Sequence, residues 1–318
     1  MKIKTRIIRS TVTDPYRNLA VEELLLEEVQ ENEIILFLWQ NKNTVVIGRN
    51  QNALTECNLM NMDADGVFLA RRMSGGGAVY HDLGNLNFTF VAQKPIYDLH
   101  RQQRVILFMA QKLGFQAEIS GRNDITIMGR KFSGNAFLHR NSASFHHGTI
   151  LIHTDSTKMA RYLNPSPVKL QRKGVPSVRS RVINLVEIKP DITVNHVIQA
   201  FQESFQEIYH SDSLEEMSFF DLPNQKLETL YARNRERHFN LGDDISYSIQ
   251  HLASFPWGTA DIRAEITDGY ISQIKIYCDS LDPDLSEKLE QELSGRSLFL
   301  PLSGEAGDIL KLLSSDAS

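Results

Sequence analysis

Three consecutive glycines, Gly75–Gly77, follow the pair Arg71-Arg72 and precede a strand-like alternation of residues. Because glycine has no Cβ and adopts positive φ readily, such a run lets backbone N–H groups close around an anion. Arginine is the side chain best shaped to grip phosphate or carboxylate. The stretch therefore predicts an anion-binding loop. The alternative is a hairpin turn beside an exposed arginine pair, although a turn does not need three glycines.

A second polar cluster brackets one short expected strand, with Asn123-Asp124 before it and Lys131 after it. Lys131 lies between Gly129 and Gly134 and heads an apolar run, so we expect it at the mouth of a pocket. A lysine there could neutralise a phosphate or a carboxylate. The alternative, which is the more common fate of a lysine in a hairpin, is a solvated surface residue.

Two adjacent histidines, His146 and His147, precede Gly148 and Thr149. Neighbouring side chains on a strand point to opposite faces, so the residues alone predict one core histidine and one surface histidine. Zinc is not expected, because no H-x-x-x-H or C-x-x-C partner lies nearby. Further on, the basic stretch Lys169–Arg181 by itself indicates an exposed loop.

These four segments, in this order, resemble the motifs of the lipoate-protein ligases, which share their fold with biotin protein ligases. The glycine stretch is similar to R-R-x-S-G-G-G-A-V-[YF]-H-D-x-G-N, and the lysine segment to G-R-N-D followed by G-R-K-x-S-G. The histidine segment is similar to H-H-G-T-[IL]-L, and the basic stretch to K-G-[IV]-x-S-V-x-S-R-V-x-N-L. Weaker matches lie at 18–23, 44–52, 255–258 and 277–281. The P-loop and Rossmann glycine patterns are absent.

The resemblance implies a role for each matched residue. Lys131 would be the central catalytic residue, contacting both the lipoate carbonyl and the adenylate phosphate. The residues that would contact ATP are Arg72, Gly77, Ala78, Val79, Tyr80, Lys131, His147, Gly148 and Thr149. Those that would contact lipoate are Ser74, Gly75, Gly76, His81 and Lys131. Asn123 and Asp124 would help to hold phosphate or Mg²⁺, and the loop that orders around the adenylate would contain Lys173, Gly174, Ser177 and Arg179.

The activity implied is that of an adenylate-forming ligase. Lipoate is activated with ATP and Mg²⁺ to lipoyl-AMP, and the lipoyl group passes to a lysine of an apo lipoyl domain, in E2 subunits of 2-oxoacid dehydrogenases or in the glycine-cleavage H protein. No tightly bound cofactor is expected. Two alternatives stay open: a lipoyl or octanoyl transferase without adenylation, and a non-catalytic lipoate-binding protein. Cys57 and Cys278 match no nucleophile motif, and the biotin-ligase G-R-G-R loop is absent.

Elements of an α/β (α+β) fold must position these residues. Asp14-Pro15 predicts the start of a helix that runs to about Asn32. Other helices are expected over 102–113, 156–163 and 194–209, and strands over 34–39, 44–47, 67–70, 78–80, 86–92, 115–119, 125–128, 132–138 and 149–153. Polar residues 41–43 are expected to form the turn between the first two strands.

The sequence pattern changes after Asp243. Strand-like runs at 245–255, 259–266 and 270–277 and helical segments at 284–293 and 304–313 predict a small α+β domain. We therefore expect a large lipoate- and ATP-binding domain over 1–243, with a mixed β-sheet and flanking helices, and an accessory domain over 244–318. The hinge would lie near 240–244. We expect the small domain and the basic loop to move when the adenylate forms.

Composition limits the partners. The formal charge of −5 gives no indication of nucleic acid as a partner. The longest apolar run, about Ile34 to Trp39, is far shorter than the roughly 20 residues that span a bilayer. The N-terminal residues lack the apolar core of a signal peptide. Two cysteines far apart fit a reducing cytosol. We expect a cytoplasmic monomer that binds neither membrane nor nucleic acid.

Overall fold

A mixed β-sheet runs through the large domain in the computed structural model, which describes residues 3–164, 182–210, 215–217, 224–242 and 247–314. Its strands, in spatial order, are β11 (Glu215–Met217), β1 (Lys4–Arg9), β2 (Glu33–Trp39), β6 (Asn85–Gln93), β10 (Ala143–Leu151), β9 (Arg130–His139), β8 (Asp124–Ile127) and β7 (Ala117–Ser120). β1 is parallel to both of its neighbours, and the other pairs are antiparallel.

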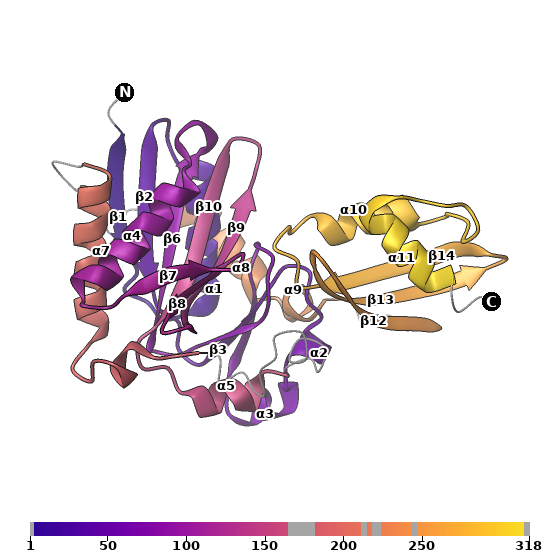
Figure 1. The fold of residues 1–318 in the computed structure, drawn as a ribbon, viewed down its shortest axis with the longest axis horizontal. Coiled ribbons are helices and arrows are strands. Elements are labelled where there is room, and N and C mark those ends of the chain that lie inside the picture. Colours follow the sequence, from indigo (N-terminus) through magenta and orange to yellow (C-terminus); the bar gives the residue numbers. More distant parts are fainter. Residues whose placement is uncertain (1–2, 165–181, 211–214, 218–223, 243–246, 315–318) are drawn as a thin grey trace.

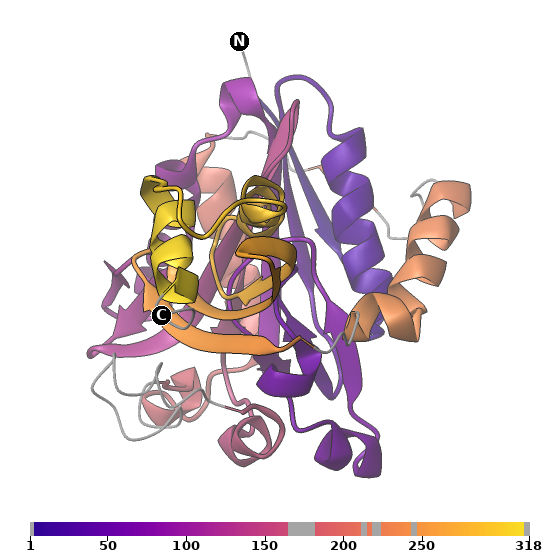
Figure 2. The ribbon, with the colours of Figure 1, turned by 90° about the vertical axis from the view of Figure 1, so that its right-hand side faces the viewer.

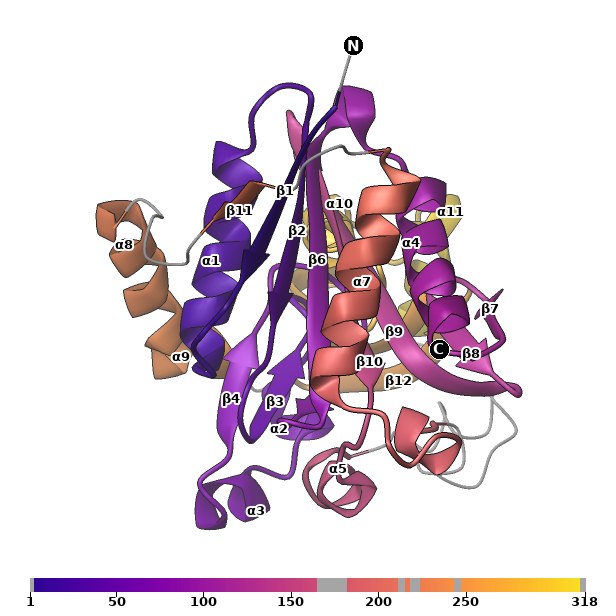
Figure 3. The same ribbon diagram turned by 90° about the vertical axis from the view of Figure 1, so that its left-hand side faces the viewer.

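Helices cover both faces of this sheet (Figure 3). Helices α4 (Leu99–Lys112) and α7 (Val194–Ile208) pack on one face, and α1 (Pro15–Glu28), backed by α8 (Asn224–Arg235), packs on the other. In α7 the apolar residues Val197, Phe201 and Phe205 recur at four-residue spacing, which places them on one buried side. Because both faces are covered, every residue of β2 is buried.

A second, three-stranded sheet carries the glycine run. Its order is β4 (Phe68–Arg71), β3 (Thr44–Ile47) and β5 (Val79–His81), with β3 in the middle. The glycines therefore connect two outer strands that each pair with β3, so the hairpin-turn alternative for this run is wrong. The expected turn at 41–43 likewise does not pair β2 with β3, because these strands belong to different sheets.

Local sequence signals account for the start of α1. Asp14 accepts hydrogen bonds from the N–H groups of Tyr16 and Arg17, and Pro15 occupies the first turn, as expected. The helix ends at Glu28, four residues earlier than predicted. Strand β10 begins at Ala143 rather than at residue 149 and so contains both histidines. The remaining elements of the large domain are η1 (Lys94–Ile96), α2 (Ala53–Glu56), α3 (Leu59–Ala64), α5 (Ser156–Tyr162), η3 (Leu185–Glu187) and α9 (Arg237–Leu241).

The small C-terminal domain has a hydrophobic core of its own. Strands β12 (Ile249–Phe255), β13 (Gly258–Thr267) and β14 (Tyr270–Cys278) form an antiparallel sheet, and helices α10 (Leu285–Leu293) and α11 (Gly304–Ser314) cover it. Asp268 and Gly269 join β13 to β14 with φ of 54° and 77°, the left-handed pair that a tight hairpin needs. The predicted boundary at 243–244 lies outside the described residues and stays a prediction.

The small domain lies to one side of the large domain (Figures 1 and 2), and it contacts the glycine run and the turn after β3. The Cys278 N–H donates to the Asn50 carbonyl at 2.9 Å, and the Gly76 N–H donates to the Ser280 carbonyl at 2.7 Å. Arg49 adds an ion pair with Asp284 at 3.7 Å. Main-chain contacts thus connect the two domains at the predicted anion-binding loop. No helix among the described residues is long and apolar enough to cross a membrane.

Candidate active site

The glycine loop is built so that only glycine fits at its tightest points. Gly76 has a φ of +89°, in the left-handed region that side chains disfavour. A Cβ on Gly75 would lie 2.2 Å from the Ser280 carbonyl oxygen, and one on Gly48 would lie 2.1 Å from the Gly76 carbonyl oxygen. A Cβ on Gly77 would meet nothing within 4 Å, so the loop is open on that side.

Arg72 holds this loop from inside. Its side chain is 7% exposed, and its guanidinium donates to the carbonyls of Val46, Gly75 and Gly77 at 3.2, 2.8 and 2.8 Å. Burial lowers its pKa to about 10, and the Glu22 carboxylate opposes that shift. Arg72 therefore stays charged at neutral pH and binds the loop carbonyls, so the exposed-arginine alternative is wrong for this residue.

Arg71 instead binds main-chain carbonyls near the junction of the two domains. Its guanidinium donates to the carbonyls of Arg49 and Gln51 at 2.9 and 2.7 Å, and to those of Phe239 and Asn240 at 3.0 and 2.8 Å. Burial lowers its pKa to about 10 as well. It connects the turn after β3 with helix α9, which precedes the small domain.

His147 and His146 are both buried, so the expectation of one surface histidine is wrong. Their rings do point to opposite faces of β10, but helices cover both faces. The His147 ring lies 2.8 Å from Ser74 Oγ through Nε2 and 2.7 Å from Glu22 Oε1 through Nδ1. The His146 ring lies 2.8 Å from Asn135 Oδ1, and burial lowers its pKa to about 3.

Lys131 is on β9, with its side chain 24% exposed. Its Nζ lies 2.6 Å from Asp124 Oδ1 on the neighbouring strand. A Cβ on Gly134 would lie 2.6 Å from this Nζ, so the ammonium occupies space that only glycine leaves open. The Gly134 N–H in turn donates to Thr149 Oγ1 at 3.3 Å. The structure thus brings Lys131, Asp124 and Thr149 together.

Asn123 supports this group through the main chain. The Asn135 N–H donates to the Asn123 carbonyl at 2.8 Å, and the Asn123 side-chain amide donates to the Asn135 carbonyl at 3.0 Å. Strand β9 also comes near the glycine loop, since a Cβ on Gly76 would lie 4.0 Å from Ala136 Cβ. Strand β9 therefore carries Lys131 near one end of the strand and approaches the glycine loop at Ala136.

The other predicted contact residues divide between these two segments and the core. Gly148 lies against the lysine hairpin, because a Cβ there would be 2.7 Å from the Gly134 carbonyl oxygen. Ala78 and Val79 are half-buried beside the loop. Tyr80 is 2% exposed, and its hydroxyl donates to Asn43 Oδ1 at 3.2 Å. Its ring packs against Tyr162, within the core of the second sheet.

His81 lies on the α1 side of the sheet. Its Nδ1 is 3.3 Å from the Asn41 amide nitrogen, so that nitrogen accepts and Nε2 carries the proton. Nε2 has no hydrogen-bond partner in the described chain, and neither does the buried Asn87 amide nitrogen. The Trp39 ring lies 6.1 Å from the His81 ring in an edge-to-face arrangement. A buried donor requires an acceptor, which a bound water or ligand can supply at these two positions.

The predicted adenylate loop, with Lys173, Gly174, Ser177 and Arg179, lies outside the described residues. The chain is described again from Val182, which forms an isolated bridge with Lys131. The Ile183 N–H donates to the Lys131 carbonyl at 2.9 Å. Val182 and Ile183, the first residues described after this gap, therefore lie directly beside the candidate catalytic lysine.

Three residues of the site were not assigned from the sequence: Glu22, Asn135 and Trp39. Glu22 carried a usable signal, because it lies three residues after Leu19 and three before Leu25, on the apolar stripe of α1. A charged residue on a buried helical face requires a partner. Asn135 and Trp39 carry no such signal.

Both cysteines are free thiols and are buried. Burial raises the pKa of Cys57 to about 12 and also raises the pKa of Cys278. Neither therefore has the environment of a nucleophilic thiolate. No group of three or more His, Cys, Asp or Glu side chains within the described ranges could hold a metal ion by itself.

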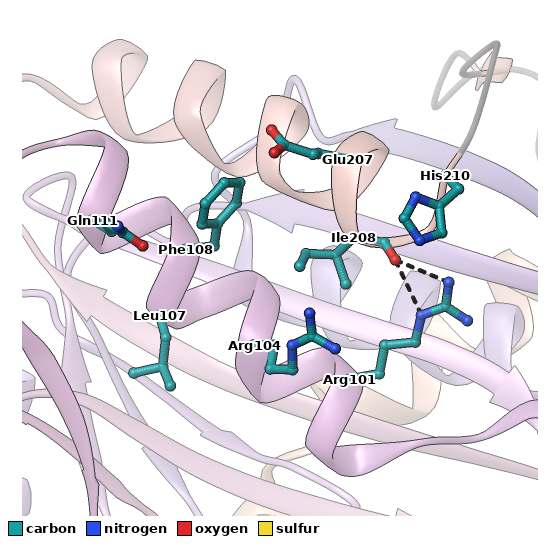
Figure 4. Close-up of a pocket in the computed structure, with 8 residues that line it drawn as sticks. All are labelled: Arg101, Arg104, Leu107, Phe108, Gln111, Glu207, Ile208 and His210. Carbon is teal, nitrogen blue, oxygen red and sulfur yellow. Dashed lines mark hydrogen bonds between the residues drawn. The ribbon is translucent and has the colours of Figure 1, made fainter.

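A separate groove of about 540 Å³ lies between α4 and α7 (Figure 4). It is lined by Arg101, Arg104, Leu107, Phe108, Gln111, Glu207, Ile208 and His210. The Arg101 guanidinium donates two hydrogen bonds to the Ile208 carbonyl, at 2.9 and 3.2 Å. None of the predicted site residues lines this groove.

A glycine loop, a lysine hairpin and a small docked domain define a ligase of the lipoyl type, and comparison with known proteins agrees. Residues 14–206 match the family model of the lipoyl protein ligase A/B catalytic domain, and residues 244–298 match that of the bacterial lipoate protein ligase C-terminus. The chain is 41% identical over 303 residues to a lipoate-protein ligase A from Psychrobacter cryohalolentis, covering 92% of this chain and 88% of that protein. The chain belongs to the lipoate-protein ligase family.

Solved structures agree with this assignment. LipL1 of P. falciparum in complex with lipoate has a TM-score of 0.83 at 28% identity, covering 98% of this chain and 99% of that one. A lipoate-protein ligase A bound with ATP has a TM-score of 0.63 at 26% identity, covering 76% and 99%. The archaeal bi-partite ligase of Thermoplasma acidophilum, studied with its E2 lipoyl domain, has a TM-score of 0.65 at 28% identity, covering 78% and 100%.

Proposed function

We propose that this lipoate-protein ligase uses ATP to convert lipoate into lipoyl-AMP and then transfers the lipoyl group to a lysine of an apo lipoyl domain. The observation that carries the proposal is the position of Lys131. Its side chain is 24% exposed, and its ammonium lies beside Asp124 and against Gly134, on a strand that approaches the glycine loop at Ala136. The ATP-bound and lipoate-bound structures of related ligases support both substrates.

The first step brings two anions together. A lipoate carboxylate oxygen attacks the α-phosphorus of ATP, and the bond from that phosphorus to the β-phosphate bridging oxygen breaks, which releases pyrophosphate. Positive charge placed in advance between the two anions stabilises the transition state. Lys131 supplies it directly, while Arg72 fixes the carbonyls of the loop so that its other surface faces the nucleotide.

The residues present fit one Mg²⁺ ion. Mg²⁺ in nucleotide sites is commonly held by one or two carboxylates together with substrate phosphates. Asp124 offers a carboxylate that is 22% exposed beside Lys131, and Asn123 is its neighbour. When bound, the ion would neutralise phosphate charge.

In the second step the neutral amine of the acceptor lysine attacks the carbonyl carbon of the mixed anhydride. The anhydride C–O bond breaks, AMP leaves, and the amine loses one proton as the amide forms. The acceptors would be lipoyl domains of E2 subunits and the glycine-cleavage H protein. The T. acidophilum ligase, studied with its E2 lipoyl domain, supports this class of partner. We also propose a cytoplasmic location and a monomeric state. The buried, protonated thiols support a mechanism that forms no thioester.

One assay tests these steps. Purified protein is mixed with ATP, Mg²⁺, lipoate and an apo lipoyl domain, and pyrophosphate release and the intact mass of the acceptor are followed. Pyrophosphate release that requires lipoate, with acceptor mass increasing only when ATP is present, supports the ligase. Acceptor modification from a carrier-bound acyl group without ATP would instead indicate a transferase. Lipoate binding with neither product would indicate a non-catalytic binding protein.

A further inference from the structure

A buried line of hydrogen bonds joins α1 to the glycine loop through β10. Arg72 Nε lies 3.1 Å from Ser74 Oγ, Ser74 Oγ lies 2.8 Å from His147 Nε2, and His147 Nδ1 lies 2.7 Å from Glu22 Oε1. All four residues are between 0 and 7% exposed. The carboxylate, imidazole and hydroxyl come from three different elements, so the line is a tertiary feature.

The donor and acceptor chemistry orders the protons along this line. A carboxylate only accepts, so His147 Nδ1 carries a proton and donates it to Glu22. A guanidinium only donates, so Ser74 Oγ accepts from Arg72. The Ser74 hydroxyl proton has two acceptors within reach, His147 Nε2 at 2.8 Å and the Gly75 carbonyl at 3.4 Å. The much shorter contact directs the proton to Nε2, and an imidazole that accepts at Nε2 and donates from Nδ1 is neutral. Ser74 and His147 thus link the charge of Arg72 to that of Glu22.

The far end of the line is also fixed. Thr89 Oγ1 lies 2.7 Å from Glu22 Oε1 and accepts from the Trp39 indole N–H at 3.1 Å. The Thr89 hydroxyl therefore donates to Glu22. Strands β2 and β6 thus supply contacts to the carboxylate that do not involve the glycine loop.

We propose that Glu22 is a positioning residue for nucleotide binding, acting on the glycine loop through His147, Ser74 and Arg72. The guanidinium that receives this orientation also holds the Gly75 and Gly77 carbonyls at 2.8 Å each. A change in the orientation of the Arg72 guanidinium therefore changes the conformation of the glycine loop. Only the nucleotide part of this inference rests on the proposed function. The line of hydrogen bonds from Glu22 to Arg72, called the relay below, is a property of the unliganded protein.

The relay has a spectroscopic signature. ¹⁵N NMR of the imidazole should show His147 as the neutral tautomer with the proton on Nδ1 and a hydrogen-bonded acceptor at Nε2. In Glu22→Gln this signature should change, and the amide signals of Gly75–Gly77 should shift with it. A His147 signal of the imidazolium, or of the Nε2–H tautomer, in the wild type would overturn the proposal.

Nucleotide affinity supplies the second measurement. Loss of one partner from a buried network should weaken binding of a non-hydrolysable ATP analogue about 10-fold in Glu22→Gln. Glu23→Gln is the matched control: Glu23 is the next residue of α1, is also buried, and pairs with Arg233 on α8. This variant should lose stability but bind the analogue within about two-fold of wild type.

A double-mutant cycle separates a relay from ordinary packing. Ser74→Ala cuts the line in its middle, so Glu22→Gln combined with Ser74→Ala should bind no more weakly than the weaker single variant. Additive losses, or normal affinity in a folded Glu22→Gln, would overturn the relay. If Glu22→Gln fails to fold, Ser74→Ala alone must show both the tautomer change and the weaker binding. A wild-type protein that binds no analogue would count against the proposed function, whereas the tautomer and loop-amide signals still decide the relay.

Discussion

His146 and His147 are consecutive residues of β10 whose rings serve opposite sides of one site. His147 lies 2.8 Å from Ser74 in the glycine loop, whereas His146 lies 2.8 Å from Asn135, whose N–H group holds the Asn123 carbonyl beside Asp124. Strand β10 lies in the interior of the sheet, between β6 and β9. The glycine loop and the lysine hairpin are therefore both hydrogen-bonded to side chains of the same two consecutive residues. This shared anchor restricts movement of the glycine loop relative to the lysine hairpin.

Lys131→Ala should abolish lipoyl-AMP formation while leaving the fold intact. The side chain is partly exposed, so its removal leaves no large cavity, but the shielded positive charge is lost. The expected cost is about 3–4 kcal/mol, roughly 10²–10³ in the rate of pyrophosphate release. Lys112→Ala, which removes a surface lysine paired with Glu203 and Glu207, is the control. Near wild-type pyrophosphate release in Lys131→Ala would rule out this role.

Gly134→Ala should impair adenylation although Lys131 is retained. The new Cβ would lie 2.6 Å from Nζ and 2.6 Å from Cε, so the flexible end of the lysine must move while the backbone need not. Displacement of a catalytic group by about 1 Å can cost roughly 10²-fold in rate. Pyrophosphate release and the thermal midpoint are measured together. A fully active Gly134→Ala would show that the observed lysine position is not the working one.

The glycine loop should lose nucleotide binding when its backbone is constrained. In Gly76→Val a side chain is forced to a φ of +89° and towards the Arg72 guanidinium at 3.1 Å. Stabilisation of the protein by ATP, read as a shift in thermal midpoint, should disappear in Gly76→Val and shrink in Arg72→Ala. If both variants are stabilised as well as the wild type, the nucleotide binds elsewhere.

Gly75→Ala should displace the small domain. The added Cβ would lie 2.2 Å from the Ser280 carbonyl oxygen and 2.9 Å from that of Leu281, and neither main-chain group can yield as a side chain could. Because the small domain has its own core, both domains should stay folded. Amide exchange over 276–282 should accelerate and the radius of gyration should rise. An unchanged scattering profile would contradict the domain contact described here.

Stability should fall as the pH drops below about 6.5, the usual pKa of histidine. Burial lowers the pKa of His81 and of His146 to about 3, so the unfolded chain takes up protons that the folded chain refuses. The stabilisation is complete above pH 6.5 and is lost as the pH falls towards 3. Each histidine should contribute about 1.4 kcal/mol per pH unit between those values. Denaturant titrations of wild type and His146→Gln at pH 7, 6 and 5 would test the slope, which should be shallower in the variant.

Signals that act over a few residues were sufficient to predict much of the fold. The cap at Asp14, the strand-like runs at 259–266 and 270–277 and the helix over 194–209 each depend on neighbours along the chain. Helix α8 was missed because its residues are mostly polar, and it is held by contacts with α1 such as Arg233 with Glu23. Such contacts are not visible as local periodicity.

The site was predictable to the extent that its residues form contiguous motifs. Lys131 and Asp124 were named together and lie 2.6 Å apart. The burial of both histidines was not foreseen, because strand alternation gives two faces but does not say that helices cover each of them. Glu22 carried a local signal on the apolar stripe of α1, but its partner could not be predicted because His147 is 125 residues away.

The burial of the two thiols has a consequence for the substrate's sulfur chemistry. Lipoate carries a strained cyclic disulfide, which an accessible thiolate would open by exchange. Cys57 is 2% and Cys278 4% exposed, and burial raises both pKa values, so neither presents a thiolate at neutral pH. A ligase of this design can hold an oxidised dithiolane without forming a mixed disulfide with it. The two thiols of this chain are therefore not placed to reduce the disulfide of the substrate.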